Sequence, residues 1–230
     1  MSQAGVRSLS SLALAVFVGV AGVQARASDD EGSRYEITVT NVTRGQQFTP
    51  ILAASHRAGV SLFSPGDPAS SELATLAEEG DTGPLTALLA ADPDVLEVVT
   101  AGPLLDPGAT RTISVRTRGP FDHLSVAAML IPTNDGFFAL NGIRGPRGRE
   151  VLSLSSPAYD SGSEANDESC LNIPGPFFSE CGGPGSGGGP AGGEEGYVHV
   201  NAGIHGIGDF DAAARDWRNP VARIVIRRVR

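Results

Sequence analysis

Arg34–Thr43 has the sequence RYEITVTNVT, in which apolar and polar side chains alternate. In an extended strand Tyr35, Ile37 and Val39 would share one face. The same two-residue period returns in Thr110–Thr117 (TRTISVRT). Alternation of this kind is typical of strands with one face against a core, so both segments predict half-buried β-strands.

Other segments extend this pattern along the chain. His123–Ile131 (HLSVAAMLI) is nearly continuous in apolar residues, as a central strand buried on both faces would be. Shorter candidate strands are Glu150–Leu154, Tyr197–Val200 and Val221–Val229.

One helical insertion is expected between the early strands. Ser70 or Ser71 can cap a helix over Glu72–Glu79, and Gly80 is suited to end it. Pro84 is well placed as the first residue of a second short helix. Strands separated by Gly/Pro turns and interrupted by two short helices predict an all-β fold, a β-sandwich with a short helical insertion.

The N-terminal 27 residues have the features of a secretory signal peptide. Arg7 supplies a basic start, Leu12–Val23 is a short apolar run, and Ala25–Ala27 forms an A-x-A cleavage site. Residues 28–230 are then expected to form one domain, secreted or periplasmic, with no later segment apolar enough to cross a membrane.

The charge distribution excludes several functions. All 17 basic residues are arginine, against 26 acids, and the formal charge of −9 becomes −11 once Arg7 and Arg26 leave with the leader. Such an acidic chain has no electrostatic reason to bind nucleic acid. The absence of lysine from the sequence excludes Schiff-base and phosphate-loop lysines. The bias towards arginine and alanine is typical of a high-GC bacterial genome.

Two cysteines, Cys170 and Cys181, are present. In an exported chain an even pair predicts a disulfide. The alternative is a pair of metal thiolates, which is disfavoured because no histidine or further cysteine lies nearby in the sequence.

The segment 181–193 (CGGPGSGGGPAGG) holds eight glycines in thirteen residues and predicts a flexible loop. It contains a G-x-G-x-x-G pattern at Gly183, Gly185 and Gly188. Phosphate binding would need a strand before this pattern and a helix after it, and neither is expected here.

An acidic stretch follows one of the expected strands. Tyr159–Ser169 (YDSGSEANDES) contains four carboxylates, an amide and several hydroxyls. Calcium prefers such oxygen ligands, and Gly162 can turn Asp160 and Glu164 towards one point. The spacing does not match an EF-hand, and a solvated acidic surface loop is the alternative interpretation.

Two further polar clusters compete with it. Asn134-Asp135-Gly136 follows the apolar segment and is a strong turn signal, yet Asp135 would project from a strand end. His199 and Asn201 would share one face of a strand, and His205 follows a glycine turn. These histidines allow either a transition-metal site or hydrogen bonds to the acidic loops. No G-x-S-x-G or H-E-x-x-H motif indicates a catalytic centre.

Several longer motifs occur in a fixed order along most of the chain. They are Tyr35–Thr43, Phe48–Leu52, Leu130–Asp135, Ala158–Glu164, Val198–Val200, Gly203–Gly206 and Asp216–Arg223. In these motifs the chain resembles the spondin N-terminal domain family, which occurs in F-spondin and mindin and as stand-alone exported bacterial proteins. The animal Asp-Ala-Gly-Thr-Asp motif corresponds to Asp160–Glu164, with glutamate in place of the final aspartate.

The resemblance implies an antiparallel β-sandwich with calcium at one loop end. We therefore expect Asp135, Asp160 and Glu164 to share a calcium ion. The supporting candidates are Asn134, His199, Asn201 and His205.

Two functions are compatible with these features. The first is an exported calcium-binding module, not an enzyme, for binding or adhesion to a protein or glycan in the extracellular space or at the cell surface. The alternative is a metal-dependent hydrolase that uses the acidic loop with His199 or His205.

Overall fold

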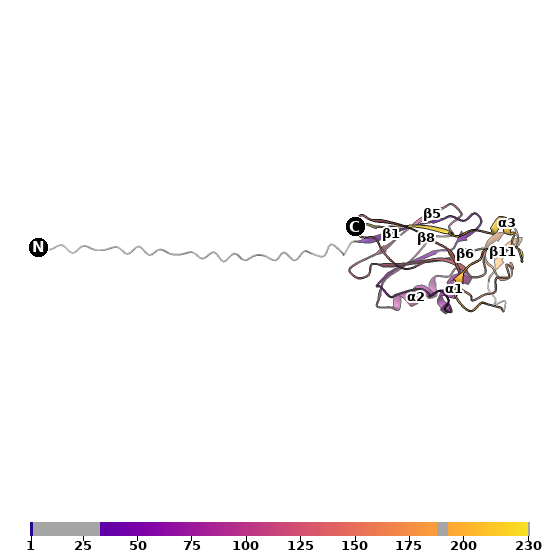
Figure 1. Cartoon of the computed structure of the whole chain (residues 1–230), viewed down its shortest axis with the longest axis horizontal. Coiled ribbons are helices and arrows are strands. Elements are labelled where there is room, and N and C mark those ends of the chain that lie inside the picture. Colours follow the sequence, from indigo (N-terminus) through magenta and orange to yellow (C-terminus); the bar gives the residue numbers. More distant parts are fainter. Residues whose placement is uncertain (2–32, 188–192, 230) are drawn as a thin grey trace.

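The computed structural model describes Met1, residues 33–187 and residues 193–229, and it shows two stacked β-sheets with helices beneath the second (Figure 1). Beyond Met1, the expected signal peptide 1–27 lies outside the described residues. No helix in the described part of the chain is long and apolar enough to span a membrane.

The first sheet has four antiparallel strands in the order β5-β1-β13-β8. Their bounds are β1 (Arg34–Asn41), β5 (Thr110–Arg116), β8 (Val151–Ser156) and β13 (Ala222–Val229). The alternation predicted for β1 is confirmed, because Tyr35, Ile37 and Val39 are buried. β1 and β13 pair along their whole length. Arg34 pairs with Val229, so the start of β1 and the end of β13 lie side by side at one end of this sheet.

The second sheet has seven strands, six of them in the order β12-β9-β7-β6-β3-β4, while β2 pairs with β6. Their bounds are β2 (Gln47–Phe48), β3 (Ile51–His56), β4 (Val95–Ala101), β6 (His123–Ile131), β7 (Gly136–Arg144), β9 (Ala158–Asp160) and β12 (His199–Val200). All of these pairings are antiparallel. The all-β sandwich predicted from the sequence is therefore confirmed.

Both faces of the second sheet are buried. On β7, Phe138 belongs to the core between the two sheets, whereas its neighbour Phe137 packs in a second core with the helices. Val126 and Ala127 divide in the same way on β6. This explains why β6 lacks the alternating pattern of a strand with one wet face.

Two helices cover the outer face of this sheet. The sequence predicted both helices but not where they would pack. They are α1 (Ser71–Glu79) and α2 (Gly83–Ala91). The Ser70 side chain accepts a hydrogen bond from Leu73 N at 3.2 Å, which caps α1. Gly80 ends the helix with a φ of 69°, a left-handed conformation that glycine adopts without strain.

The remaining elements form the end of the molecule at which the acidic loop lies. They are β10 (Pro174–Phe178), β11 (Gly183–Ser186) and α3 (Ala212–Arg215). β10 and β11 pair as a hairpin, so this part of 181–193 is a strand and differs from the flexible loop expected there. Residues 188–192 lie outside the described residues.

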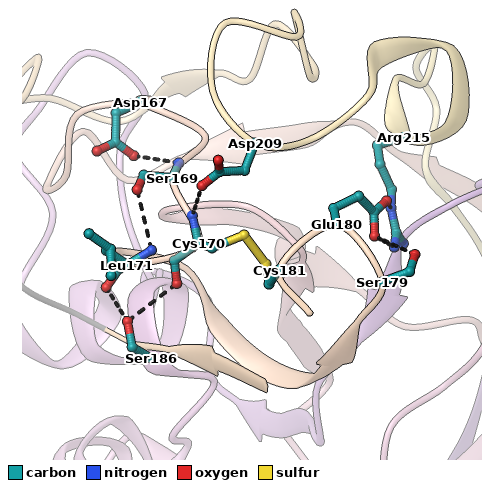
Figure 2. Close-up of a disulfide and its surroundings, with 10 residues drawn as sticks. All are labelled: Asp167, Ser169, Cys170, Leu171, Ser179, Glu180, Cys181, Ser186, Asp209 and Arg215. Atoms are coloured by element: carbon teal, nitrogen blue, oxygen red, sulfur yellow. Dashed lines mark hydrogen bonds and ion pairs between the residues drawn. A yellow bond between two sulfur atoms is a disulfide. The ribbon is translucent and has the colours of Figure 1, made fainter. Parts of the chain in front are cut away.

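The predicted disulfide is present and joins the segment before β10 to the turn between β10 and β11. Cys170 and Cys181 are bonded, with their Cα atoms 5.6 Å apart (Figure 2). Cys170 N donates to Asp209 Oδ2 at 2.8 Å, which ties the disulfide to the segment before α3 (Figure 2).

Candidate metal centre

Three neighbouring strands assemble the acidic cluster. In the second sheet β9 lies between β7 and β12, and Asp160 of β9 pairs with both Gly136 and His199. Asp135 immediately precedes Gly136. Strand pairing therefore brings Asp135, Asp160 and His199 to one edge of the sheet, although 64 residues separate the first from the last along the chain.

Asp135 is buried and uses only one of its carboxylate oxygens. Oδ2 accepts hydrogen bonds from Ser161 Oγ at 2.9 Å and from the backbone N–H groups of Ser163 at 2.9 Å and Glu164 at 3.2 Å. Oδ1 is buried and has no hydrogen-bond partner among the described residues. Such an oxygen retains the desolvation penalty of a charged group without compensation.

Asp160 is buried as well, but both of its oxygens are occupied. Oδ1 accepts from Gly162 N at 2.9 Å, and Oδ2 accepts from Asn166 Nδ2 at 2.8 Å and Asn201 Nδ2 at 3.0 Å. Burial, followed by the neighbouring charge of Asp135, raises the pKa of Asp160 to about 7.

Gly162 allows the loop to close at this point. It has a φ of 67°, and a Cβ there would lie 2.3 Å from the carbonyl oxygen of Tyr197. Only glycine therefore fits between the acidic loop and the segment leading to β12.

Glu164 resembles Asp135. It is buried, and its Oε2 has no hydrogen-bond partner in the described structure. Burial first, and then the charges of Glu78 and Asp135, raise the pKa of Glu164 to about 8. By contrast, burial alone would raise the pKa of Asp167, but donors from Ser169, Asn134 and Asn172 hold it below its ordinary value.

The supporting candidates have different positions. Asn134 holds the acidic loop, because its Oδ1 accepts from Glu168 N at 3.2 Å and its Nδ2 donates to Asp167 at 2.9 Å. Asn201 turns its amide nitrogen to Asp160, so it orients this carboxylate by donating to it.

The two histidines are not equivalent. His199 Nε2 lies 3.5 Å from Asp160 Oδ1, at the cluster. The His205 side chain is exposed, and the contact of His205 with the acidic loop is made by its backbone N–H, which donates to Glu168 Oε1 at 2.5 Å.

Two acids that sequence analysis did not single out also belong to this region. Glu168 is buried, and its carboxylate accepts backbone N–H groups from His205, Gly206 and Ile207. Glu195 Oε2 lies 4.0 Å from His199 Nε2. The four-residue spacing of Glu195 and His199 was visible in the sequence, but their nearness to Asp160 depends on the pairing of β9 with β12.

Asp135 Oδ1 and Glu164 Oε2 are buried carboxylate oxygens with no hydrogen-bond donor among the described residues. Carboxylate oxygens are ligands of the kind that calcium takes. Asp160, Glu195 and His199 each offer one ligand atom, and these three atoms lie within 4.8 Å of one another. Among the described residues, this is the group of three His, Cys, Asp or Glu residues whose ligand atoms lie so close together.

Fold and site together define an antiparallel β-sandwich module with an acidic loop cluster at one end. Residues 39–144 match the family model Spondin_N, which supports the resemblance to the spondin N-terminal domain family that the motifs indicate. The match includes Asp135 and ends before Asp160. A comparison with curated proteins gives no match. The family indicates an extracellular type of module and is not a known enzyme family.

Proposed function

We propose that this protein is an exported calcium-binding β-sandwich module that binds a protein or glycan in the extracellular space or at the cell surface. The observation that carries the calcium site is the pair of buried, unpartnered oxygens, Asp135 Oδ1 and Glu164 Oε2. They belong to residues joined directly, because Glu164 N donates to the other oxygen of Asp135.

A buried carboxylate oxygen that has no hydrogen-bond donor can be stabilised by protonation or by a cation. The raised pKa of Glu164 expresses the first solution, and a divalent ion supplies the second. Calcium binds six to eight oxygens, including carboxylates, carbonyls and waters. Asp135 and Glu164 would bind it, and Asp160 would add a third carboxylate held in place by Asn166 and Asn201.

The bound cation would supply positive charge between loops that otherwise repel one another. Asp135 already organises the backbone at Ser163 and Glu164 through its other oxygen. The ion would therefore fix the acidic loop against the start of β7 and so hold the shape of this end of the sandwich.

Exposed apolar side chains around the acidic loop support a binding role. Leu171, Tyr197, Val200 and Ile207 are exposed large hydrophobic residues on segments that flank it. Where such side chains form one patch, they favour a binding site over a purely structural loop. Resemblance to an extracellular type of family supports the same interpretation.

Calorimetric titration of the chelator-treated protein with calcium tests the metal site. We expect saturable binding that Asp135→Asn and Glu164→Gln each weaken by about tenfold or more, since each removes a charged ligand. Glu194→Gln is the control, because Glu194 is exposed and its removal changes the net charge equally. Unchanged isotherms for both ligand variants would contradict the proposal.

The competing hypothesis of a metal-dependent hydrolase is tested separately. The purified protein would be screened against ester, phosphoester, peptide and glycoside substrates, with and without chelator. A binding module should give no turnover in either condition. Chelator-sensitive turnover that is lost in Asp160→Asn would favour the hydrolase instead.

A further inference from the structure

Asp160, Glu195 and His199 form a mixed nitrogen and oxygen group on the side of Asp160 that faces β12. Their ligand atoms all lie within 4.8 Å of one another. The side chain of Asp160 is 1% exposed, whereas those of His199 and Glu195 are 26% and 32% exposed. The group therefore joins a buried carboxylate to two side chains that are partly exposed, with His199 Nε2 itself buried.

The backbone determines which nitrogen of His199 faces the carboxylates. Nδ1 lies 3.2 Å from the carbonyl oxygen of Val200, which can only accept a hydrogen bond. Nδ1 therefore carries the hydrogen in the neutral ring, and Nε2 presents its lone pair. A histidine whose other nitrogen is bonded to a backbone carbonyl is the usual arrangement of a metal ligand.

Nε2 itself has no hydrogen-bond partner among the described residues, although the atom is buried. It faces Asp160 Oδ1 at 3.5 Å and Glu195 Oε2 at 4.0 Å. In the neutral ring a lone pair directed at two carboxylates is repulsive, and a proton on Nε2 or a metal ion between the three groups would relieve this repulsion.

The distances indicate what kind of cation fits. A charged hydrogen bond from a histidine would bring the nitrogen to about 2.8 Å from an oxygen, which is shorter than either separation. Two ligand atoms bound to a tetrahedral zinc ion, at about 2.0–2.1 Å from the metal, lie about 3.4 Å apart. The separation of 3.5 Å between His199 Nε2 and Asp160 Oδ1 is close to this value, whereas Glu195 Oε2, at 4.0 Å from His199 Nε2, would have to move inward to complete the site.

Asn166 contacts the second oxygen of both carboxylates, Asp160 and Glu195. Asn166 Nδ2 donates to Asp160 Oδ2 at 2.8 Å and lies 3.4 Å from Glu195 Oε1. Hydrogen bonds of this kind to the ligands are typical of built metal sites, where they fix the direction of the ligand oxygens.

We infer that Asp160, Glu195 and His199 form a second metal site, selective for a borderline cation of the zinc class. Imidazole nitrogen favours zinc over calcium, which takes oxygen ligands. The site uses the side of Asp160 towards His199, whereas the unpartnered oxygens of Asp135 and Glu164 belong to the proposed calcium position. It does not depend on calcium being bound there.

The test is a titration of chelator-treated, calcium-free protein with zinc by calorimetry and with cobalt(II) by visible absorption. We expect one zinc-class site in the wild type. His199→Gln and Glu195→Gln should each lower zinc affinity by about tenfold or more, since each removes one of three ligands. His205→Gln and Glu194→Gln are matched controls with exposed side chains, and both should leave the affinity unchanged.

Asp135→Asn separates this site from the calcium position. It should weaken calcium binding and leave zinc binding within about threefold, a difference of less than 1 kcal/mol. Circular dichroism checks that each variant is folded. If His199→Gln does not fold, Glu195→Gln still tests the inference, because Glu195 lies on an exposed segment. Equal zinc affinity in wild type, His199→Gln and Glu195→Gln would overturn the inference, as would loss of zinc binding in Asp135→Asn or His205→Gln.

Discussion

Glu168 and Asp135 show two different environments for a buried carboxylate within one loop cluster. The carboxylate of Glu168 accepts three backbone N–H groups, from His205, Gly206 and Ile207. That of Asp135 has several donors on Oδ2 and no donor on Oδ1. Charged hydrogen bonds of the first kind stabilise the fold, whereas the second arrangement leaves charge for a ligand to neutralise.

The first prediction concerns the stability of Asp135→Asn relative to the wild type, which should differ in sign between calcium-free and calcium-containing buffer. An asparagine could place its amide oxygen at the position of Oδ2 and its NH2 at that of the unpartnered oxygen. In calcium-free buffer Asp135→Asn should therefore unfold with a free energy equal to that of the wild type or up to about 1 kcal/mol greater, because it removes an uncompensated buried charge.

With saturating calcium the order should reverse, because the wild type gains more binding free energy than the variant. Urea unfolding with and without calcium measures both differences. A variant that is less stable than the wild type by the same amount in both buffers would contradict the assignment of Asp135 as a calcium ligand.

Residue-level prediction from the sequence succeeded where the relevant contacts are local, as at Ser70, which caps α1, and Gly80, which ends it. The joint role of Asp135, Asp160 and Glu164 as calcium ligands stays a prediction. Glu195 was not predicted, because only the pairing of β9 with β12 brings it to Asp160. The unpartnered state of Asp135 Oδ1 likewise depends on how the loop folds over it, which no spacing in the sequence records.

At the level of elements, the β10–β11 hairpin is attached to the rest of the molecule at its turn. Glu180 lies between the two strands and forms a two-pronged ion pair with Arg215 of α3, with N–O distances of 2.7 and 2.9 Å. Arg215 also donates to Gly45 O at 2.8 Å. One guanidinium thus connects the hairpin, α3 and the segment after β1 (Figure 2 shows the Glu180–Arg215 pair).

The second prediction follows from this ion pair. Hydrogen bonds from Arg215 hold the pKa of Glu180 at about 2, below its ordinary value of 4.5. A lowered pKa stabilises the folded state above pH 4.5, and this contribution is lost as the pH falls through about 2. At pH 7 the free energy of unfolding of the wild type should exceed that of Glu180→Gln by about 1–2 kcal/mol.

The difference between the two proteins should shrink steadily as the pH is lowered from 4.5 towards 2, as measured by urea unfolding at a series of pH values. Glu150→Gln, an exposed acid whose side chain accepts a backbone N–H within its own turn, serves as the control. A difference that is constant with pH would argue against the ion pair as its source.

The third prediction concerns the disulfide between Cys170 and Cys181. It closes a short loop, and the chain-entropy relation gives a stabilisation of about 3 kcal/mol. The double variant with serine at both positions should lose about this amount in urea unfolding. A thiol assay on the denatured, unreduced wild type should detect no free sulfhydryl, and detection of two would contradict the pairing.

Prediction of the elements depended on how clearly each pattern could be recognised. β6 was predicted with its observed bounds because nine residues with few polar side chains suit a strand buried on both sides. β3 and β7 were not predicted, because short apolar runs do not distinguish a strand from a buried helical segment. β10 and β11 are rich in glycine and proline, which are depleted in strands, so neither strand could be recognised from the sequence.

At the scale of the whole molecule, the fourth prediction links calcium to global stability. An ion that binds only the folded protein stabilises it by RT ln(1 + [L]/Kd), about 2.7 kcal/mol at a hundredfold excess over Kd. For a domain of this size the Tm should rise by about 5–10 °C. It should fall again with chelator, while the circular dichroism at low temperature stays the same.

Magnesium at the same concentration is the control for ionic strength, and it should have a smaller effect because it requires a tighter octahedral arrangement. A Tm that does not respond to calcium, or that responds equally in Glu164→Gln, would contradict calcium binding at this cluster.

The pairing of Arg34 with Val229 has a practical consequence for how the domain can be oriented. The start of β1 and the end of β13 lie together at one end of the sandwich, and β11 and α3 lie at the opposite end (Figure 1). The acidic loop belongs to that opposite end, since Glu168 O accepts from Asp209 N next to α3. A bead, sensor chip or fusion partner joined before Arg34 or after Val229 would therefore display the loop end outward, accessible to whatever passes over it.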